Sequence, residues 1–314
     1  MRCVAIVDGS LAIQERPDPV PGSGEVLVAI KAAGLNAADL LQRRGGYPAP
    51  PGSPADIPGL ECAGVVAALG DGVSSVALGD RVMAVVGGGG QSTHLVIHER
   101  VLIPVPDNVT WPEAGGFPEA FATAHDALFT QCGLGMGERV LIHGAAGGVG
   151  TAAVQLAHAV GAHVTATVRN VARHDEVRAL GADVVVMPDA FVEHGPFDVV
   201  LELVGAPNMD GNLAALATGG RISVIGVGSG FSAEVSLLTL MQKRASIRGS
   251  TMRARPLEQK ADMSKRLERH ALPLLADGRL VVPVLETFPL AEASAAYDRF
   301  AAGGKLGKIV LVTD

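Results

Sequence analysis

The stretch His143–Gly150, HGAAGGVG, has glycines at a spacing that suits a dinucleotide. Gly147 and Gly150 hold the last two glycine positions of G-x-G-x-x-G, and Ala145 stands at the first. Such glycines let the backbone approach a pyrophosphate and let a helix pack closely on a strand, while the N-terminus of that helix attracts the phosphates. The pattern predicts cofactor binding by Gly144, Ala145, Ala146, Gly147, Gly148, Val149 and Gly150.

The corner after the next apolar segment, HVTATV, bears on which nucleotide binds. A carboxylate there would favour NAD, because it binds the ribose hydroxyls and repels a 2′-phosphate. This chain has Arg169, Asn170 and Arg173 instead, and no carboxylate before Asp175. Arginine suits phosphate by charge and geometry, so the corner favours NADPH. The alternative, that these arginines are solvated surface residues, stays open.

The elements needed to position these groups follow from the pattern of apolar runs. Residues 1 to about 110 alternate apolar and polar positions between Gly/Pro turns, which is typical of a β-rich unit. The glycine run in VVGGGGQSTHL is expected to be a flexible stretch between two strands. From about 114 to 250, β-branched runs alternate with helix-like segments, which indicates parallel β-α-β units. Two of the expected helices are WPEAGGFPEAFATAHDALFTQCGL, at the start of this region, and MDGNLAALATGG. The tail has a long charged helix pattern near PLEQKADMSKRLERH, then a strand, a helix and a last strand, GKIVLV. The expected fold class is α/β.

Composition excludes several classes. The 314 residues carry a formal net charge of −7 and no basic stripe, so we expect no nucleic-acid partner. Three scattered cysteines make a disulfide framework improbable. The first residues lack the apolar core of a signal peptide, and no uncharged apolar run reaches membrane-spanning length. We therefore expect a cytoplasmic protein that does not bind membranes.

Several motifs together resemble one family, over nearly the whole chain. They are GLNAADLLQRRGGYP, IPGLECAGVV, GDRVMAVVGGGGQ, PEAFATAHDAL, VLIHGAAGGVGTAAVQLA and GKIVL. The chain is similar to the medium-chain dehydrogenases/reductases in their zinc-free, zeta-crystallin-like NADPH:quinone oxidoreductase branch, and in particular to the tumour-suppressor-induced subgroup. The resemblance implies a GroES-like catalytic domain, 1–113 and 251–314, interrupted by a Rossmann domain with a doubly wound parallel sheet, 114–250. It also implies a cofactor cleft between the two.

Zinc members of this family place a Cys and a His where this chain has Asn36 and Leu60. Leucine cannot bind a metal and asparagine is a poor zinc ligand, so we expect no metal site. Without zinc, hydride from NADPH can reach only an acceptor that is already electron-poor. A quinone is the expected acceptor, with a conjugated enoyl or 2-alkenal group as the alternative. A crystallin-like protein that binds NADPH with little turnover also stays open.

The resemblance implies further site residues. Tyr47 lines the substrate cleft and is expected to be catalytic, together with Asn36 and Gln91. The alternatives are that Tyr47 is a half-buried loop residue without a catalytic role, that Asn36 caps a helix, and that Gln91 is a plain loop residue. Relatives often carry Asn-Tyr where this chain has Met187-Pro188, and that tyrosine helps to bind the 2′-phosphate or the adenine. In this chain, binding of the 2′-phosphate is therefore expected to depend more on Arg169 and Arg173. The family pattern also implies a homodimer. Further cofactor contacts are expected at Asn36, Thr123, Val204, Gly205, Ile225, Gly226 and Lys308.

Overall fold

The computed structural model describes residues 1–313 and divides the chain into two compact units. One unit comprises Met1–Ala122 and Met252–Asp314, and the other Thr123–Thr251. The first boundary lies further along the chain than the expected division after residue 113, because α2, Trp111–Gly116, packs on β3, Glu25–Gly34, and β4, Glu61–Leu69. The helix α3, Pro118–His125, crosses the boundary.

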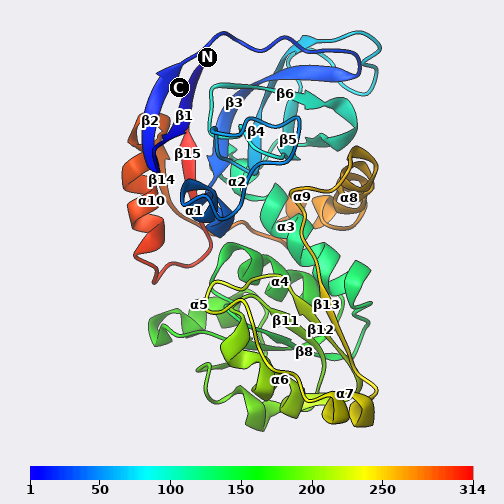
Figure 1. Cartoon of the computed structure of the whole chain (residues 1–314). Coiled ribbons are helices and arrows are strands. Elements are labelled where there is room, and N and C mark those ends of the chain that lie inside the picture. Colours follow the sequence, from blue (N-terminus) through cyan, green and yellow to red (C-terminus); the bar gives the residue numbers. More distant parts are fainter. Residues whose placement is uncertain (314) are drawn as a thin grey trace. The chain divides into compact units, whose positions relative to one another are not determined.

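The first unit is built on a seven-stranded sheet in the order β14-β15-β3-β4-β5-β7, with β6 also paired to β3 (Figure 1). Alternate residues of β3 are buried, as the sequence pattern predicts for a strand with one face on a core. A separate hairpin pairs β1, Arg2–Val7, with β2, Ser10–Glu15. The remaining elements are α1, Ala37–Arg43; β5, Arg81–Val85; β6, His94–His98; β7, Ile103–Pro104; α8, Leu257–His270; α9, Leu272–Ala276; β14, Val284–Pro289; α10, Ala293–Ala301; and β15, Lys308–Val312.

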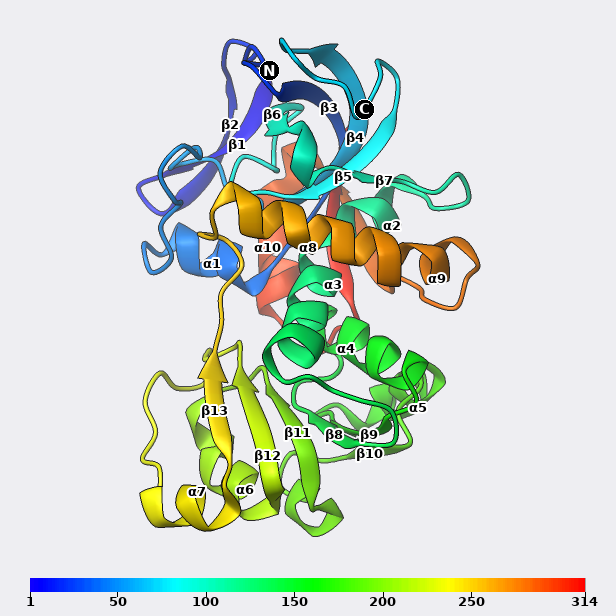
Figure 2. The same cartoon turned by 90° about the vertical axis from the view of Figure 1, so that its right-hand side faces the viewer.

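The second unit is a six-stranded, all-parallel sheet in the order β10-β9-β8-β11-β12-β13 (Figure 2). In chain order this is 3-2-1-4-5-6, the doubly wound arrangement. The expected α/β class is therefore confirmed. Its strands are β8, Arg139–Ile142; β9, His163–Thr167; β10, Val184–Val186; β11, Phe197–Glu202; β12, Leu216–Val224; and β13, Ser246–Gly249. Its helices are α4, Gly148–Ala159; α5, His174–Ala179; α6, Met209–Ala215; and α7, Leu237–Lys243.

Two segments of the second unit differ from the pattern-based expectation. The helix expected over MDGNLAALATGG ends at Ala215, and β12 begins at Leu216 with the glycine pair Gly219–Gly220 inside it. Glycine lowers helix stability and permits the positive φ of +79° that Gly219 adopts. A π-helical turn, Asp126–Gln131, follows α3 where a regular helix was expected. Within residues 1–313, none of the helices combines the length and apolar character that crossing a bilayer requires.

Candidate functional site

The glycine loop joins β8 to α4 in the second unit, as the sequence predicts. Gly144 has a φ of +63°, which favours glycine. A Cβ added at Gly150 would lie 2.5 Å from the Gly144 carbonyl oxygen, so only glycine lets α4 begin this close to the loop. The Ala145 N–H donates to the Thr167 carbonyl and thereby ties the loop to the end of β9.

The N-terminus of α4 suits a pyrophosphate. In the described chain no side chain caps it, and its N-cap residue is Gly147. The first N–H groups of a helix have no acceptor within the helix, and the dipole of this 12-residue helix favours negative charge there. The loop also follows the strand at which the sheet order reverses, which is where open α/β sheets bind ligands. These features fit a dinucleotide.

The other predicted cofactor residues of this sheet lie at the ends of β11 and β12. Ile225 and Gly226 both donate their N–H groups to the Glu202 carbonyl, which brings the two strand ends together. A Cβ on Gly226 would lie 2.4 Å from the Leu203 carbonyl oxygen. Gly205 has a φ of +121°, and a Cβ added there would lie 2.7 Å from the Gly230 carbonyl oxygen and 2.9 Å from Val227 Cα. The pairs Val204–Gly205 and Ile225–Gly226 therefore share one edge of the sheet.

A buried network under these strand ends was missed by the sequence analysis. Glu202 is fully buried, and its Oε1 accepts from the Val204 N–H at 2.7 Å and the Gly205 N–H at 2.8 Å. Its Oε2 accepts from Asn212 Nδ2 at 2.7 Å, while Asn212 Oδ1 lies 2.7 Å from His143 Nε2. Burial lowers the pKa of His143, although the Glu202 carboxylate opposes this. An acid within the apolar strand FDVVLE was the available signal.

The basic corner after β9 is only partly available to a ligand. Arg173 Nη1 donates to both carboxylate oxygens of Glu176, at 2.8 and 2.9 Å. Asn170 uses its Oδ1 to accept the Ala172 N–H and so begins a short helical turn. Arg169 is exposed. Of the three predicted contacts, Arg169 is therefore the one best able to meet a 2′-phosphate.

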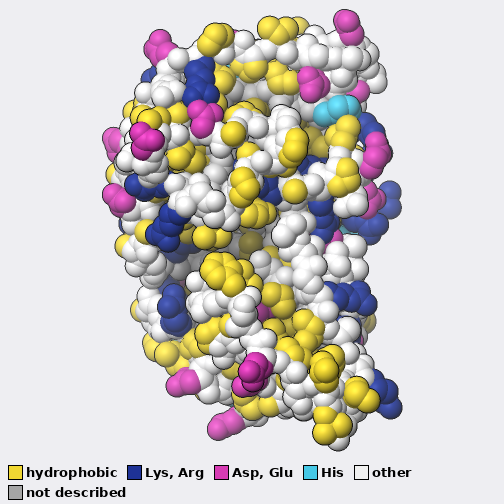
Figure 3. All heavy atoms as spheres, viewed as in Figure 1, with side chains coloured by type: hydrophobic (Ala, Val, Ile, Leu, Met, Phe, Trp, Pro, Cys, Tyr) yellow, Lys and Arg dark blue, Asp and Glu magenta, His cyan; other side chains and the backbone are white. Residues whose placement is uncertain are grey.

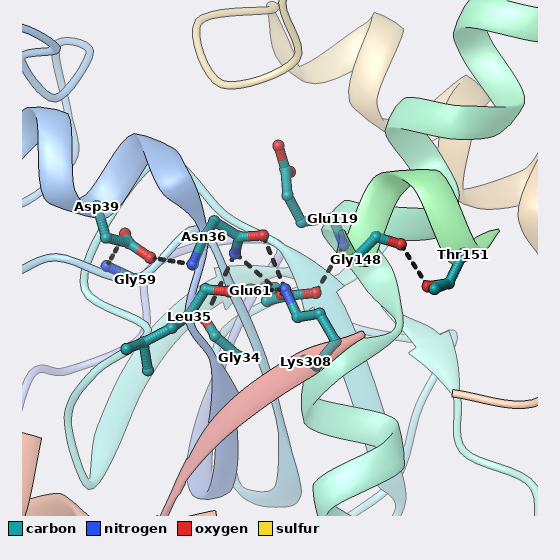
Figure 4. A network of polar contacts seen from close by, with 10 residues as sticks. All are labelled: Gly34, Leu35, Asn36, Asp39, Gly59, Glu61, Glu119, Gly148, Thr151 and Lys308. Carbon is teal, nitrogen blue, oxygen red and sulfur yellow. Dashed lines mark hydrogen bonds and ion pairs between the residues drawn. The ribbon is translucent and has the colours of Figure 1, made fainter. Parts of the chain in front are cut away.

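In the first unit, Asn36 and Lys308 meet in a buried polar network around Glu61 (Figure 4). Lys308 Nζ donates to Glu61 Oε1 at 2.5 Å, Asn36 Oδ1 at 2.8 Å and the Leu35 carbonyl at 2.9 Å. Glu61 also accepts from Asn36 Nδ2 at 2.9 Å and, through Oε2, from the Glu119 N–H at 2.8 Å. All three donors of the ammonium group are thus used, so Lys308 holds Asn36 rather than pointing a donor outward.

Asp39 belongs to the same cluster and was also missed. It is fully buried, and its carboxylate accepts from the N–H groups of Asn36 at 2.8 Å and Gly59 at 3.1 Å. Burial raises the pKa of Asp39 to about 6, against the opposing effect of these hydrogen bonds. Asn36 is the N-cap residue of α1, as anticipated. Leu60, the other position compared with zinc ligands, is buried and apolar.

The predicted catalytic residues Gln91 and Tyr47 and the predicted cofactor contact Thr123 differ in their exposure to solvent. Gln91 is fully buried, and its Oε1 accepts a hydrogen bond from the Tyr297 hydroxyl at 2.9 Å. This placement gives Gln91 a structural role in the first unit and does not favour the expected substrate contact. Tyr47 is partly exposed. Thr123 is buried in α3.

The glycine run before Gln91 is packed, although its composition indicated a flexible stretch. Gly87, Gly88, Gly89 and Gly90 are all buried. The Gly89 and Gly90 N–H groups donate to the carbonyls of Ile57 and Gly59. A Cβ on Gly90 would lie 2.7 Å from the Glu61 carbonyl oxygen. The run is therefore a close approach between backbone segments.

Comparisons with known proteins agree with both units. Residues 22–107 match the family model for the alcohol dehydrogenase GroES-like domain, and residues 148–269 match the model for zinc-binding dehydrogenases. The chain is 32% identical to a structure described as a probable oxidoreductase from Mycobacterium abscessus, covering 99% of this chain and 98% of that one, with a TM-score of 0.85. Mycobacterial Rv1454c, solved as a complex with NADPH, is 26% identical with a TM-score of 0.89, over 99% of this chain and 100% of that one.

A longer curated relative is also similar. The chain is 35% identical over 302 residues to part of the phenolphthiocerol/phthiocerol polyketide synthase of Mycobacterium tuberculosis. This match covers 93% of the chain but spans only 14% of the synthase polypeptide.

Proposed function

Because the chain belongs to the medium-chain dehydrogenase/reductase superfamily, we propose that it is an NADPH-dependent reductase that needs no metal. Its acceptor is a carbon–carbon double bond conjugated to a carbonyl group, as in enoyl compounds and quinones. One observation carries this proposal. At the positions compared with zinc ligands, Leu60 is buried and apolar, while the Asn36 amide is bonded to Glu61 and Lys308. With no zinc to polarise an isolated carbonyl, the acceptor must be electron-poor by itself.

The residues of the second unit fit NADPH. The N-terminus of α4 and the loop Gly144–Gly150 would hold the pyrophosphate, and Arg169 would meet the 2′-phosphate. The strand ends at Val204–Gly205 and Ile225–Gly226 would line the same ligand. When bound, NADPH supplies a hydride, and Tyr47 donates a proton to the acceptor oxygen. Water then restores the proton to Tyr47.

Similarity to polyketide synthases favours an enoyl acceptor. Growing polyketide chains are held as thioesters, and dehydration of a hydroxyacyl thioester places a double bond next to the thioester carbonyl. We therefore expect turnover of a short trans-enoyl thioester. The Tyr47→Phe variant should lose more activity on this substrate than on a quinone, because hydride addition to the enoyl thioester leaves an enolate that is much more basic than a hydroquinone anion and so depends more on a proton donor.

A quinone remains the second candidate, supported by the QRRGGYP and GGGQ motifs of the chain. The test mixes protein and NADPH with a naphthoquinone or an enoyl thioester and follows NADPH absorbance. The Arg169→Ala, Arg173→Ala double variant should bind NADPH about tenfold more weakly, while Arg178→Ala, which removes an exposed arginine of α5, should not. Tight binding without consumption of any acceptor would instead support the crystallin-like alternative and overturn the proposal.

A further inference from the structure

Arg253 is a fully buried cation that the proposed mechanism does not use. Its side chain is 1% exposed, and its guanidinium reaches three separate segments of the first unit. Nε donates to the Gly87 carbonyl, Nη1 to the Tyr47 carbonyl and Nη2 to Gln42 Oε1, each at 2.7 Å. Burying the charge of an arginine is costly even when its hydrogen-bond donors are satisfied. A function for this buried charge is therefore worth seeking.

The hydrogen bonds of Arg253 lie on the backbone side of Tyr47. One acceptor is the main-chain carbonyl of Tyr47 itself, and another, Gln42, lies in α1 just before the loop that carries the tyrosine. Gln42 is in turn anchored by its Nε2, which donates to the Ala55 carbonyl at 3.0 Å. The third acceptor is in the packed glycine run. A single planar fork thus fixes the Tyr47 backbone, the end of α1 just before it and the glycine run.

The same guanidinium lies against the Tyr47 ring, with Cζ 5.2 Å from the ring centroid. All three hydrogen-bond acceptors are uncharged oxygens, and the carboxylates that act on the cation, Asp39 and Glu119, do so without a hydrogen bond to it. Burial raises the pKa of Tyr47 and the nearby Glu119 carboxylate adds to this, whereas Arg253 opposes both. The positive charge therefore favours loss of the phenolic proton.

We propose that Arg253 is a positioning residue for proton donation: it fixes the Tyr47 loop and directs its charge at the Tyr47 ring. This inference rests on the proposed function, in which Tyr47 is the proton donor. In that step, hydride forms a new C–H bond at the β-carbon, and the π-electron pair moves to the carbonyl oxygen. The Tyr47 O–H bond breaks, its proton goes to that oxygen, and the phenolate takes a proton from water. The resulting enol becomes the saturated product when its α-carbon takes a proton from water and the oxygen-bound proton is released to water.

The chain offers a direct readout, because Tyr47 and Tyr297 are its only tyrosines. Burial also raises the pKa of Tyr297, which is 1% exposed and bonded to Gln91. The first tyrosinate absorbance step on raising the pH therefore reports Tyr47. Arg253→Met should move this step upward by at least about half a pH unit and lower kcat by about tenfold or more. Arg253→Lys keeps the charge, so its tyrosinate step and its kcat should both lie between those of Arg253→Met and those of the wild type.

Arg81→Met is the matched control. Arg81 also stacks on an aromatic ring, with Cζ 4.5 Å from the Trp111 centroid, and donates to the carbonyls of Asp107 and Val109. Its removal should leave the tyrosinate step and kcat unchanged. In a Tyr47→Phe background, Arg253→Met should have little further effect on kcat.

The outcomes separate the two proposals. If the tyrosinate step moves but no conjugated acceptor is reduced, the positioning of Tyr47 stands and the proposed function fails. If acceptors are reduced but Arg253→Met moves neither the tyrosinate step nor kcat, or matches Arg81→Met in both, the inference is overturned. Should Arg253→Met not fold, Arg253→Lys decides the question by the same two measurements.

Discussion

Asp39 shows how one buried side chain can carry a measurable consequence. Its ordinary pKa of 3.8 becomes about 6 in the native state because burial penalises the carboxylate. Between these values the native carboxyl holds a proton that the unfolded chain has lost. Its contribution to the unfolding free energy is therefore present below pH 3.8 and is lost as the pH rises through about 6, by at most about 3 kcal/mol.

Asp39→Asn should remove this pH dependence. We expect the difference in unfolding free energy between wild type and variant to change between about pH 4 and pH 6, in urea titrations at each pH. Asp298→Asn, an exposed change in α10, is the control. A constant difference across that range would contradict the account of Asp39.

At the scale of single residues, the sequence identifies residues that belong to a recognisable motif. It does not identify residues whose role depends on being buried. Asn36 and Lys308 were predicted as cofactor contacts, and the structure joins them to each other by a hydrogen bond. Glu61, Asp39 and Glu202 were missed, because an acid in a sequence does not reveal whether its oxygens accept buried N–H groups. Gln91 was placed at a pocket by its neighbours, yet its contact with Tyr297 joins residues more than two hundred positions apart in the chain.

At the scale of elements, Glu202 couples the ends of the Rossmann strands. Glu202→Leu would leave the buried N–H groups of Val204 and Gly205 without their acceptor. We expect a loss of about 3 kcal/mol in unfolding free energy and weaker NADPH binding. Glu202→Gln keeps an oxygen for both N–H groups and should lose less. Equal stability of the two variants, by chemical unfolding, would show that the network does not hold these strand ends.

The element order was largely predictable, since periods of two and of about 3.6 residues mark strands and helices. The β-α-β alternation and the glycine loop follow from local patterns. The start of β12 at Leu216 did not, because Leu216–Ala217 reads equally well as helix and its strand pairing is with Phe197, far along the chain. The packed glycine run likewise depends on segments that only the tertiary fold brings together.

At the scale of the whole molecule, we propose that the chain forms a homodimer through the second unit. The strand β13 ends the six-stranded sheet and pairs only with β12 in the described chain. Exposed apolar side chains gather over the neighbouring helix α7 (Figure 3). They include Leu237, Leu238 and Met241. A second copy related by a two-fold axis would pair both edges and cover both patches.

Sedimentation tests this interface. The Leu238→Glu, Met241→Glu double variant should sediment as a monomer while the wild type sediments as a dimer. Leu78→Glu changes an equally exposed apolar residue of the first unit and should remain dimeric. A monomeric wild type, or a double variant that stays dimeric, would refute the proposal.

The central claim is hydride transfer from NADPH to a conjugated acceptor without a metal. The most direct measurement treats the protein with a chelator, confirms by elemental analysis that zinc is absent, and adds an enoyl thioester or naphthoquinone with NADPH deuterated at the transferring position. We predict unchanged turnover, with deuterium at the β-carbon of the reduced enoyl product. Activity that disappears on chelation and returns with zinc, or no turnover of either acceptor, would contradict the account.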